Sequence, residues 1–162
     1  MSAAEALKAA RSAGVLLGID GDALTLEAAA APPRAVLDQL ARHKADVMAL
    51  LRPAGGGWSA LDWLAYFDGR ERSAVAHGVV RAEAGVRAFA CCVVEWLNRN
   101  PAASVPGRCA WCGETESSSA VIIPFGIESE KHAWLHSECW HDWHRARRTD
   151  AVAALNSMGI RA

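Results

Sequence analysis

The chain has 162 residues, of which 52% are hydrophobic and 22% are charged, and its formal net charge is −1. A composition this apolar excludes a disordered chain, and this length suits one domain of ordinary size or two small ones. Because basic and acidic residues stay balanced along the chain, we do not expect a strongly basic nucleic-acid binder.

The first residues do not have the pattern of a targeting signal. Glu5 and Lys8 interrupt the apolar core that a signal peptide needs, and no apolar run is long enough to predict a transmembrane helix. Five cysteines, an odd number, fit a reducing compartment better than a set of disulfides. We therefore expect a cytoplasmic protein without membrane contact, and the high Ala, Arg and Gly content is typical of bacterial genes.

The first part of the chain predicts an αββα unit. Ser2 and Glu5 have the spacing of a capping box, so a helix should begin there and end near Gly14. Alternating apolar residues over 15–27, with a turn signal at the centre, predict a β-hairpin. Helical spacing of apolar residues over 35–52 predicts a second helix that closes the unit.

Four short segments in this unit resemble the TubC-type N-terminal docking domain, which occurs at the front of nonribosomal peptide synthetase and hybrid polyketide synthase subunits. They are Glu5-Ala-Leu-Lys, Gly14-Val-Leu-Leu, Asp20-Gly-Asp-Ala-Leu and the stretch from His43 to Arg52. The resemblance covers about residues 3–52 and implies a small αββα domain, often a homodimer, whose hairpin captures a segment of an upstream subunit. The chain departs from the family at Ala28–Ala31, where a proline-containing turn usually follows the second strand.

Capture of a partner segment by the hairpin would proceed by strand addition, in which backbone hydrogen bonds supply affinity and alternate side chains supply specificity. The candidate partner-binding residues are Leu16, Gly18, Thr25 and Glu27. The alternative is that these residues form the solvated face of a two-stranded sheet. No condensation, adenylation or carrier domain is present in the sequence, which suggests that the docking fold has been reused.

Two helices are predicted in the middle of the chain. The first begins at Ser59, where Asp62 completes a cap, and is expected to end at Gly69. The second, over 81–100, is apolar almost all round at its centre, so we expect burial on most of its sides. Its two adjacent cysteines are expected to be packed thiols rather than metal ligands, because neighbouring helical residues point in different directions.

A metal site is predicted from Cys109, Cys112, His136 and Cys139, which form a C-x2-C pair and an H-x2-C pair. Three thiols and an imidazole are a structural zinc set. The order of knuckle, short strands and helix is that of a treble-clef finger, with a helix N-terminus lowering the pKa of Cys139. The alternatives are a cluster of buried free thiols and a Cys109–Cys112 disulfide.

Four protein ligands favour a closed, structural zinc site over a catalytic one. His132, His141 and His144 lie near it in sequence and leave an HNH-like metal-dependent nuclease as a less favoured alternative. The surrounding tryptophans, Trp111, Trp134, Trp140 and Trp143, are expected to cover the site. A basic cluster, Arg145, Arg147 and Arg148, leaves nucleic-acid binding through the finger as a further alternative.

The sequence therefore predicts an α+β fold with three parts. They are a docking-like domain over 1–52, a glycine-rich linker over 53–57, and a helical domain over 58–162 with the zinc-finger-like site at 109–139. We expect a non-enzymatic protein-interaction protein without catalytic residues, which holds a structural Zn²⁺ and binds a partner segment through the hairpin. The alternative is a mobile-element or phage-related accessory protein that binds nucleic acid.

Overall fold

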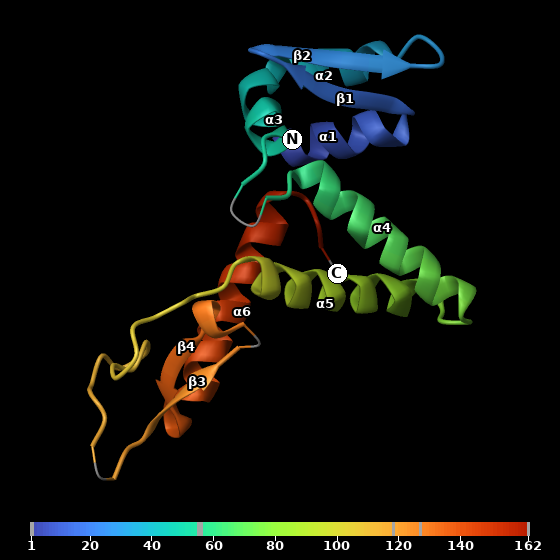
Figure 1. Ribbon diagram of the computed structural model, residues 1–162. Helices are drawn as coiled ribbons and strands as arrows, with labels where there is room; N and C mark the ends of the chain where they lie inside the picture. The colour runs from blue at the N-terminus through green and yellow to red at the C-terminus, as the bar shows by residue number, and fades with distance from the viewer. Residues whose placement is uncertain (1, 55–56, 118, 127, 162) are drawn as a thin grey trace. The chain divides into compact units, whose positions relative to one another are not determined.

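The computed structural model confirms a mixed α+β chain and describes residues 2–54, 57–117, 119–126 and 128–161 (Figure 1). The chain forms two compact units, which we call unit 1, Met1–Cys92 with Ala154–Ala162, and unit 2, Val93–Ala153. The predicted linker over 53–57 includes two residues, 55 and 56, that lie outside the described ranges. Within the described residues, no helix is long and apolar enough to cross a membrane.

Helix α1, Ala3–Ser12, begins at the predicted capping box. The Ser2 hydroxyl accepts a hydrogen bond from the Glu5 backbone N–H at 3.3 Å, and the Glu5 carboxylate accepts one from the Ser2 backbone N–H at 2.6 Å. Small residues and Leu7 form the buried face of the helix. Gly14, with φ of 72°, directs the chain into the first strand, as the sequence predicted.

The predicted hairpin is present as β1, Val15–Asp20, and β2, Ala23–Ala28, which pair antiparallel with Asp20 opposite Ala23. The two-residue turn has Gly21 at φ 57° and no other residue with positive φ, as in a type II′ turn. Val15 and Leu17 are buried on the inner face of the sheet, whereas β2 has five exposed residues out of six. In Figure 1 the hairpin (blue) lies beside α1 and the helical segment over 34–51.

The single helix predicted over 35–52 is in fact two helices, α2, Arg34–Arg42, and α3, Lys44–Leu51. The chain turns at His43, whose N–H donates to Gln39 and whose carbonyl accepts from Val47. Hydrogen bonding therefore continues on both sides of the turn, while the helix axis changes direction. The turn keeps apolar residues at helical spacing, so periodicity alone does not detect it. The unit is αββαα rather than αββα.

Helix α4, Ala60–Ala76, has the predicted Ser59–Asp62 capping box but does not end at Gly69. A glycine inside a helix costs about 1 kcal/mol relative to alanine, which is too little on its own to end a helix. The helix continues to Ala76, although no residue from Gly69 onward is buried in it, and Gly78 at φ 86° then turns the chain. Near its start, Trp63 is 2% exposed and lies edge-on to Trp58 at 4.7 Å between ring centroids. The α4 prediction was therefore right about the start and wrong about the end.

Helix α5, Arg81–Arg99, is present as predicted, but it is not buried on most sides. The buried residues along it are Ala84, Ala88, Cys92 and Val93, whereas Val86 and Val94 are 55% and 59% exposed. A narrow buried stripe is therefore enough to pack this helix, and part of its apolar surface remains accessible. Cys92 is a packed thiol, as expected, and the half-buried Cys91 accepts a hydrogen bond from Arg70 at 3.4 Å.

The remaining elements are β3, Ile122–Phe125, η1, Ser129–Lys131, β4, Ala133–His136, η2, Ser137–Cys139, and α6, Trp140–Ser157. After α6, Gly159 at φ 82° turns the chain so that Ile160 is buried in unit 1. A Cβ atom on Gly159 would lie 2.9 Å from the Cβ of Ala4, so glycine is required here by space as well as by conformation.

Candidate functional site

The segment that carries the first cysteine pair is a tight knuckle. Its N–H groups bond back across the turn, from Cys109 to the Glu114 carbonyl at 2.9 Å and from Gly113 to the Cys109 carbonyl at 3.0 Å. Gly113 has φ of 77°, which only glycine adopts without strain. The Ala110 N–H donates to the Trp134 carbonyl at 2.8 Å, so the knuckle is attached directly to β4.

The β3–β4 hairpin brings the second ligand pair to this knuckle. β4 ends at His136, which lies opposite Ile122 of β3, and η2 carries Cys139. The ligand atoms of Cys109, Cys112, His136 and Cys139 all lie within 4.8 Å of one another. The structure therefore brings together the four residues that the sequence singled out.

The chemistry of the cluster fits a metal ion. Cys112 Sγ lies 3.4 Å from His136 Nδ1, and all five cysteines are free thiols, so the alternative Cys109–Cys112 disulfide is absent. His136 is only 4% exposed, and its Nε2 has no hydrogen-bond partner among the described residues. Because the Cys112 thiol is the one side-chain polar contact of the imidazole within the described residues, a shared cation explains its orientation better than hydrogen bonding does.

Burial is uneven across the cluster. Cys109 is 2% exposed, Cys139 is half-buried and Cys112 is exposed. A cluster of buried free thiols would not leave one thiol open to water beside an imidazole. The arrangement instead resembles a shallow metal site at the surface, supported from beneath by a small core.

Two thiols of the cluster have displaced pKa values in opposite directions. Burial raises the pKa of Cys109, but backbone hydrogen bonds, led by those of Cys112 and His136, outweigh it and lower the pKa to about 6. Burial, together with hydrogen bonds to the Cys109 and Cys112 sulfurs, raises the pKa of Cys139 to about 12. Three sulfurs this close hold one negative charge easily, and further ionisation requires a cation between them.

The predicted lowering of the Cys139 pKa by a helix N-terminus is therefore wrong. Cys139 lies in the short turn η2, which has no side-chain cap, and α6 begins only at Trp140. The thiol therefore precedes the helix, and burial, followed by the influence of the Cys109 and Cys112 sulfurs, raises its pKa.

Aromatic side chains cover one side of the finger. The buried core of Cys109, Ile122, Ala133 and Leu135 is packed by Phe125, Trp134, Cys139, Trp140 and Trp143. Trp140 stacks on Phe125 at 4.7 Å and on His144 at 4.9 Å between ring centroids. Three of the four tryptophans expected over the site are thus in place, whereas Trp111, at the knuckle tip, is 47% exposed.

The other histidines stay out of the metal cluster, which contains only the four ligand residues among those described. His144 stacks on Trp140, His132 lies edge-on to Trp134 at 6.3 Å, and His141 is exposed. No constellation of histidine and carboxylate gathers around the four ligands within the described part of the chain.

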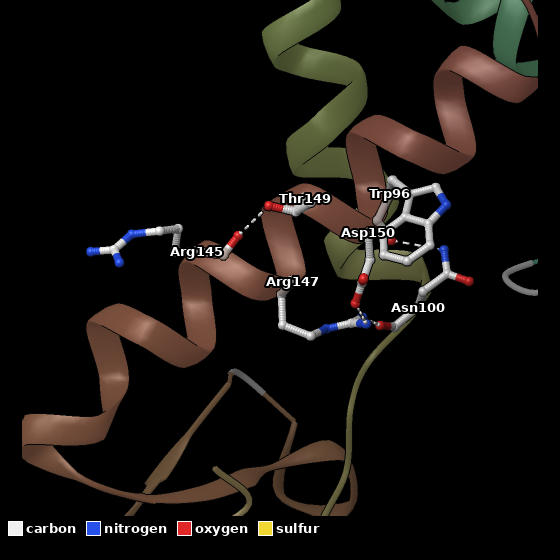
Figure 2. Close-up of polar contacts among 6 residues, drawn as sticks. All are labelled: Trp96, Asn100, Arg145, Arg147, Thr149 and Asp150. Carbon is white, nitrogen blue, oxygen red and sulfur yellow. Dashed lines mark hydrogen bonds and ion pairs between the residues drawn. The ribbon is translucent and has the colours of Figure 1, made fainter.

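The basic cluster on α6 is largely engaged within unit 2 (Figure 2). Arg147 donates to the Asn100 carbonyl, lies 3.4 Å from the Asp150 carboxylate and sits over the Trp96 ring at 5.1 Å. Arg145 pairs with Asp142 at 3.0 Å. Arg147 is thus a structural clamp between α6 and the end of α5, whereas Arg148 is exposed.

The four candidate partner-binding residues lie on the same face of the β1–β2 sheet. Leu16 is opposite Glu27 and Gly18 is opposite Thr25, so all four residues lie on the face opposite to the buried Val15 and Leu17. A Cβ on Gly18 would lie 2.8 Å from the Thr25 hydroxyl, so glycine leaves room for that side chain to cross the strand. Leu16 is 70% exposed on this face.

The outer edge of β2 has unused backbone groups. In a hairpin with a two-residue turn, the pair next to the turn is hydrogen-bonded and the pairs then alternate. Leu24, Leu26 and Ala28 therefore direct their N–H and C=O groups outward, and no hydrogen bond from the described residues reaches them. This edge is available for an added strand.

Comparison with protein-family models, with curated proteins and with solved structures found no match for this chain. The metal cluster and the open strand edge are therefore the features that bear on function, and the docking-domain resemblance remains a prediction.

Proposed function

We propose that this chain is a non-enzymatic protein-interaction module in which a structural zinc ion holds unit 2 and the β1–β2 hairpin binds an extended partner segment. The observation that carries the proposal is the grouping of three thiols and one imidazole within 4.8 Å. Four protein ligands complete a tetrahedral shell, which leaves no position for water or substrate. The site therefore supports a stabilising role rather than a catalytic one.

Zinc is the metal that this donor set favours. Thiolates with one imidazole select zinc over the hard cations magnesium and calcium, which require oxygen ligands. The order of a glycine-containing knuckle, a β-hairpin and a helix that follows the last ligand supports a treble-clef-like finger. His136 would bind through Nδ1, the nitrogen that faces the thiols.

The partner-binding half of the proposal is supported by the open edge and the exposed face of the same hairpin. An added strand would satisfy the outward groups of Leu24 and Leu26, while Leu16, Gly18, Thr25 and Glu27 would contact its side chains. We propose a cytoplasmic partner protein and, in keeping with the family that residues 3–52 resemble, association of unit 1 as a homodimer. A monomer in sedimentation at micromolar concentration would contradict the dimer.

Metal analysis tests the first half. Protein purified without added metal should contain about one zinc per chain. The Cys109→Ser variant should lose it, whereas Cys92→Ser, which alters a buried thiol outside the cluster, should keep it. Equal zinc in both variants, or none in the wild type, would refute the zinc site.

Amide hydrogen exchange tests the second half. The N–H groups of Thr25 and Glu27, which lie in hydrogen-bonded pairs, should be protected in the free protein. Those of Leu24 and Leu26 should exchange freely and become protected when a partner strand binds. Protection of Leu24 and Leu26 in the dilute, unbound chain would show that the edge is not available.

A further inference from the structure

Unit 2 contains a cavity of about 550 Å³ that does not include any of the four metal ligands. It lies between the end of α5, the loop at 100–102, the end of β3 and the outer face of α6. A volume of roughly 300–1,000 Å³ is typical of pockets that bind small molecules. The cavity is therefore large enough for a compact organic ligand.

The walls of this cavity are mainly aromatic and aliphatic. Phe125, Trp140, Trp143 and His144 supply four rings, and Trp140 is parallel to Phe125 within 9°. Val94 and Leu97 of α5 supply apolar surface from another side. Aromatic walls favour a ligand that is itself a flat ring. Offset stacked and edge-to-face ring contacts add binding free energy beyond that gained from burying apolar area.

The charged groups around the cavity neutralise one another. Lys131 pairs with Glu128 at 2.7 Å. Arg147 is held by Asp150 and the Asn100 carbonyl. No cation or anion of the lining is left to balance a charge on a ligand, and burying an unpaired charge is costly. The ligand should accordingly be uncharged.

We infer that this cavity binds an uncharged, planar aromatic molecule. The rings of Trp140 and Trp143 form the wall against which it packs, and the Asn98 amide and the His144 ring nitrogens are polar groups of the lining that can orient a hydrogen-bonding edge. This inference goes beyond the proposed interaction function and does not depend on the identity of the metal or on the hairpin.

The test uses the full chain and the uncharged probe N-phenyl-1-naphthylamine, whose fluorescence rises in apolar surroundings. We expect saturable binding, with shifts of the Trp140 and Trp143 indole N–H resonances. Val94→Asp places a carboxylate in the wall and should weaken binding about tenfold or more. Val86→Asp is the matched control: both valines are exposed on α5, at 59% and 55%, but only Val94 lines the cavity.

Three results would overturn the inference. They are an absence of saturable binding, equal weakening by the two aspartate variants, or equally tight binding of the anionic relative 8-anilinonaphthalene-1-sulfonate. Far-UV circular dichroism that matches the wild type should accompany both variants, since each changes an exposed residue. If only the Val94→Asp protein misfolds, the test is made on the wild-type protein. The Trp140 and Trp143 indole N–H resonances must then shift with the neutral probe, and unshifted resonances would overturn the inference.

Discussion

The two hairpins of this molecule are held in different ways. β1–β2 rests one face on the helices of unit 1, with Val15 and Leu17 buried as in an ordinary apolar core. β3–β4 covers a core of only four buried residues, one of which is the metal-ligand candidate Cys109. A core that small seldom folds without a disulfide, a metal or a partner. We therefore expect unit 2, but not unit 1, to require a metal ion for folding.

The hairpins also differ at their edges. Trp134 of β4 directs its N–H to the Ser104 hydroxyl and its carbonyl to Ala110, so this edge is covered. Trp134 is opposite Pro124 in the register. Because the backbone groups of Trp134 face away from β3, those of Pro124 face the outer edge of β3, where proline has no N–H to offer. Pro124 therefore blunts the other edge, a common protection against unwanted strand pairing. The β2 edge has neither protection.

Removal of the metal should produce the largest difference between the two hairpins. A strong chelator should unfold β3–β4 and leave β1–β2 intact, because zinc contributes roughly 10–16 kcal/mol to the folding of finger peptides. Amide signals of Ile123 and Leu135 should collapse in two-dimensional NMR spectra, while those of Leu17 and Thr25 should persist. Dispersed β3–β4 signals in protein shown to be free of metal would contradict the link.

Two neighbouring leucines of β1 test whether apolar burial stabilises the β1–β2 hairpin. Leu17→Ala should cost about 2–5 kcal/mol of unfolding free energy, because it leaves a cavity under the sheet. Leu16→Ala, on the exposed face, should cost less than about 0.5 kcal/mol. Leu17 is 9% exposed and Leu16 is 70% exposed. Denaturant titration measures the unfolding free energy of both variants, and the zinc content should remain unchanged in each. Similar losses of unfolding free energy in the two variants would show that the inner face of the sheet is not part of the core.

The C-terminal turn should show a smaller effect of packing. Gly159→Ala combines a positive φ with a 2.9 Å approach to Ala4, whereas Gly78→Ala has a similar φ and nothing within 4 Å. Overpacking costs about 1–3 kcal/mol, so Gly159→Ala should be less stable than Gly78→Ala by that amount. Thermal denaturation of the two variants makes the comparison, and equal melting temperatures would mean that α1 moves aside freely.

The smallest effect is expected at the first cap. The hydrogen bond from the Ser2 backbone lowers the pKa of Glu5 below its ordinary value of 4.5. A lowered acid pKa stabilises the fold above the ordinary value, and that contribution disappears as pH falls through the lowered pKa. Wild-type protein should exceed Glu5→Gln in stability at pH 7 and lose this advantage in acid. Amide signals of β1–β2 provide the measurement, so loss of metal from unit 2 does not interfere.

Local signals in the sequence were sufficient for several features. Capping boxes at Ser2 and Ser59, the turn at Gly21 and the spacing of the cysteine pairs each involve residues within a few positions of one another, and the structure contains all of them.

Other features were missed because short-range patterns do not determine them. Helical spacing continues across the turn at His43, and α4 continues through Gly69 to Ala76. Burial, together with hydrogen bonds to sulfurs about thirty residues away in the chain, raises the pKa of Cys139, and the local helix argument ignored both causes.

X-ray absorption at the zinc edge of the purified full chain is the measurement that best tests whether Cys109, Cys112, His136 and Cys139 form a closed zinc site. The claim predicts three sulfur atoms at about 2.3 Å and one nitrogen at about 2.0–2.1 Å, with no oxygen in the shell. A shell with two or fewer sulfurs completed by oxygen would contradict a closed structural site, because an open position would then be available to water.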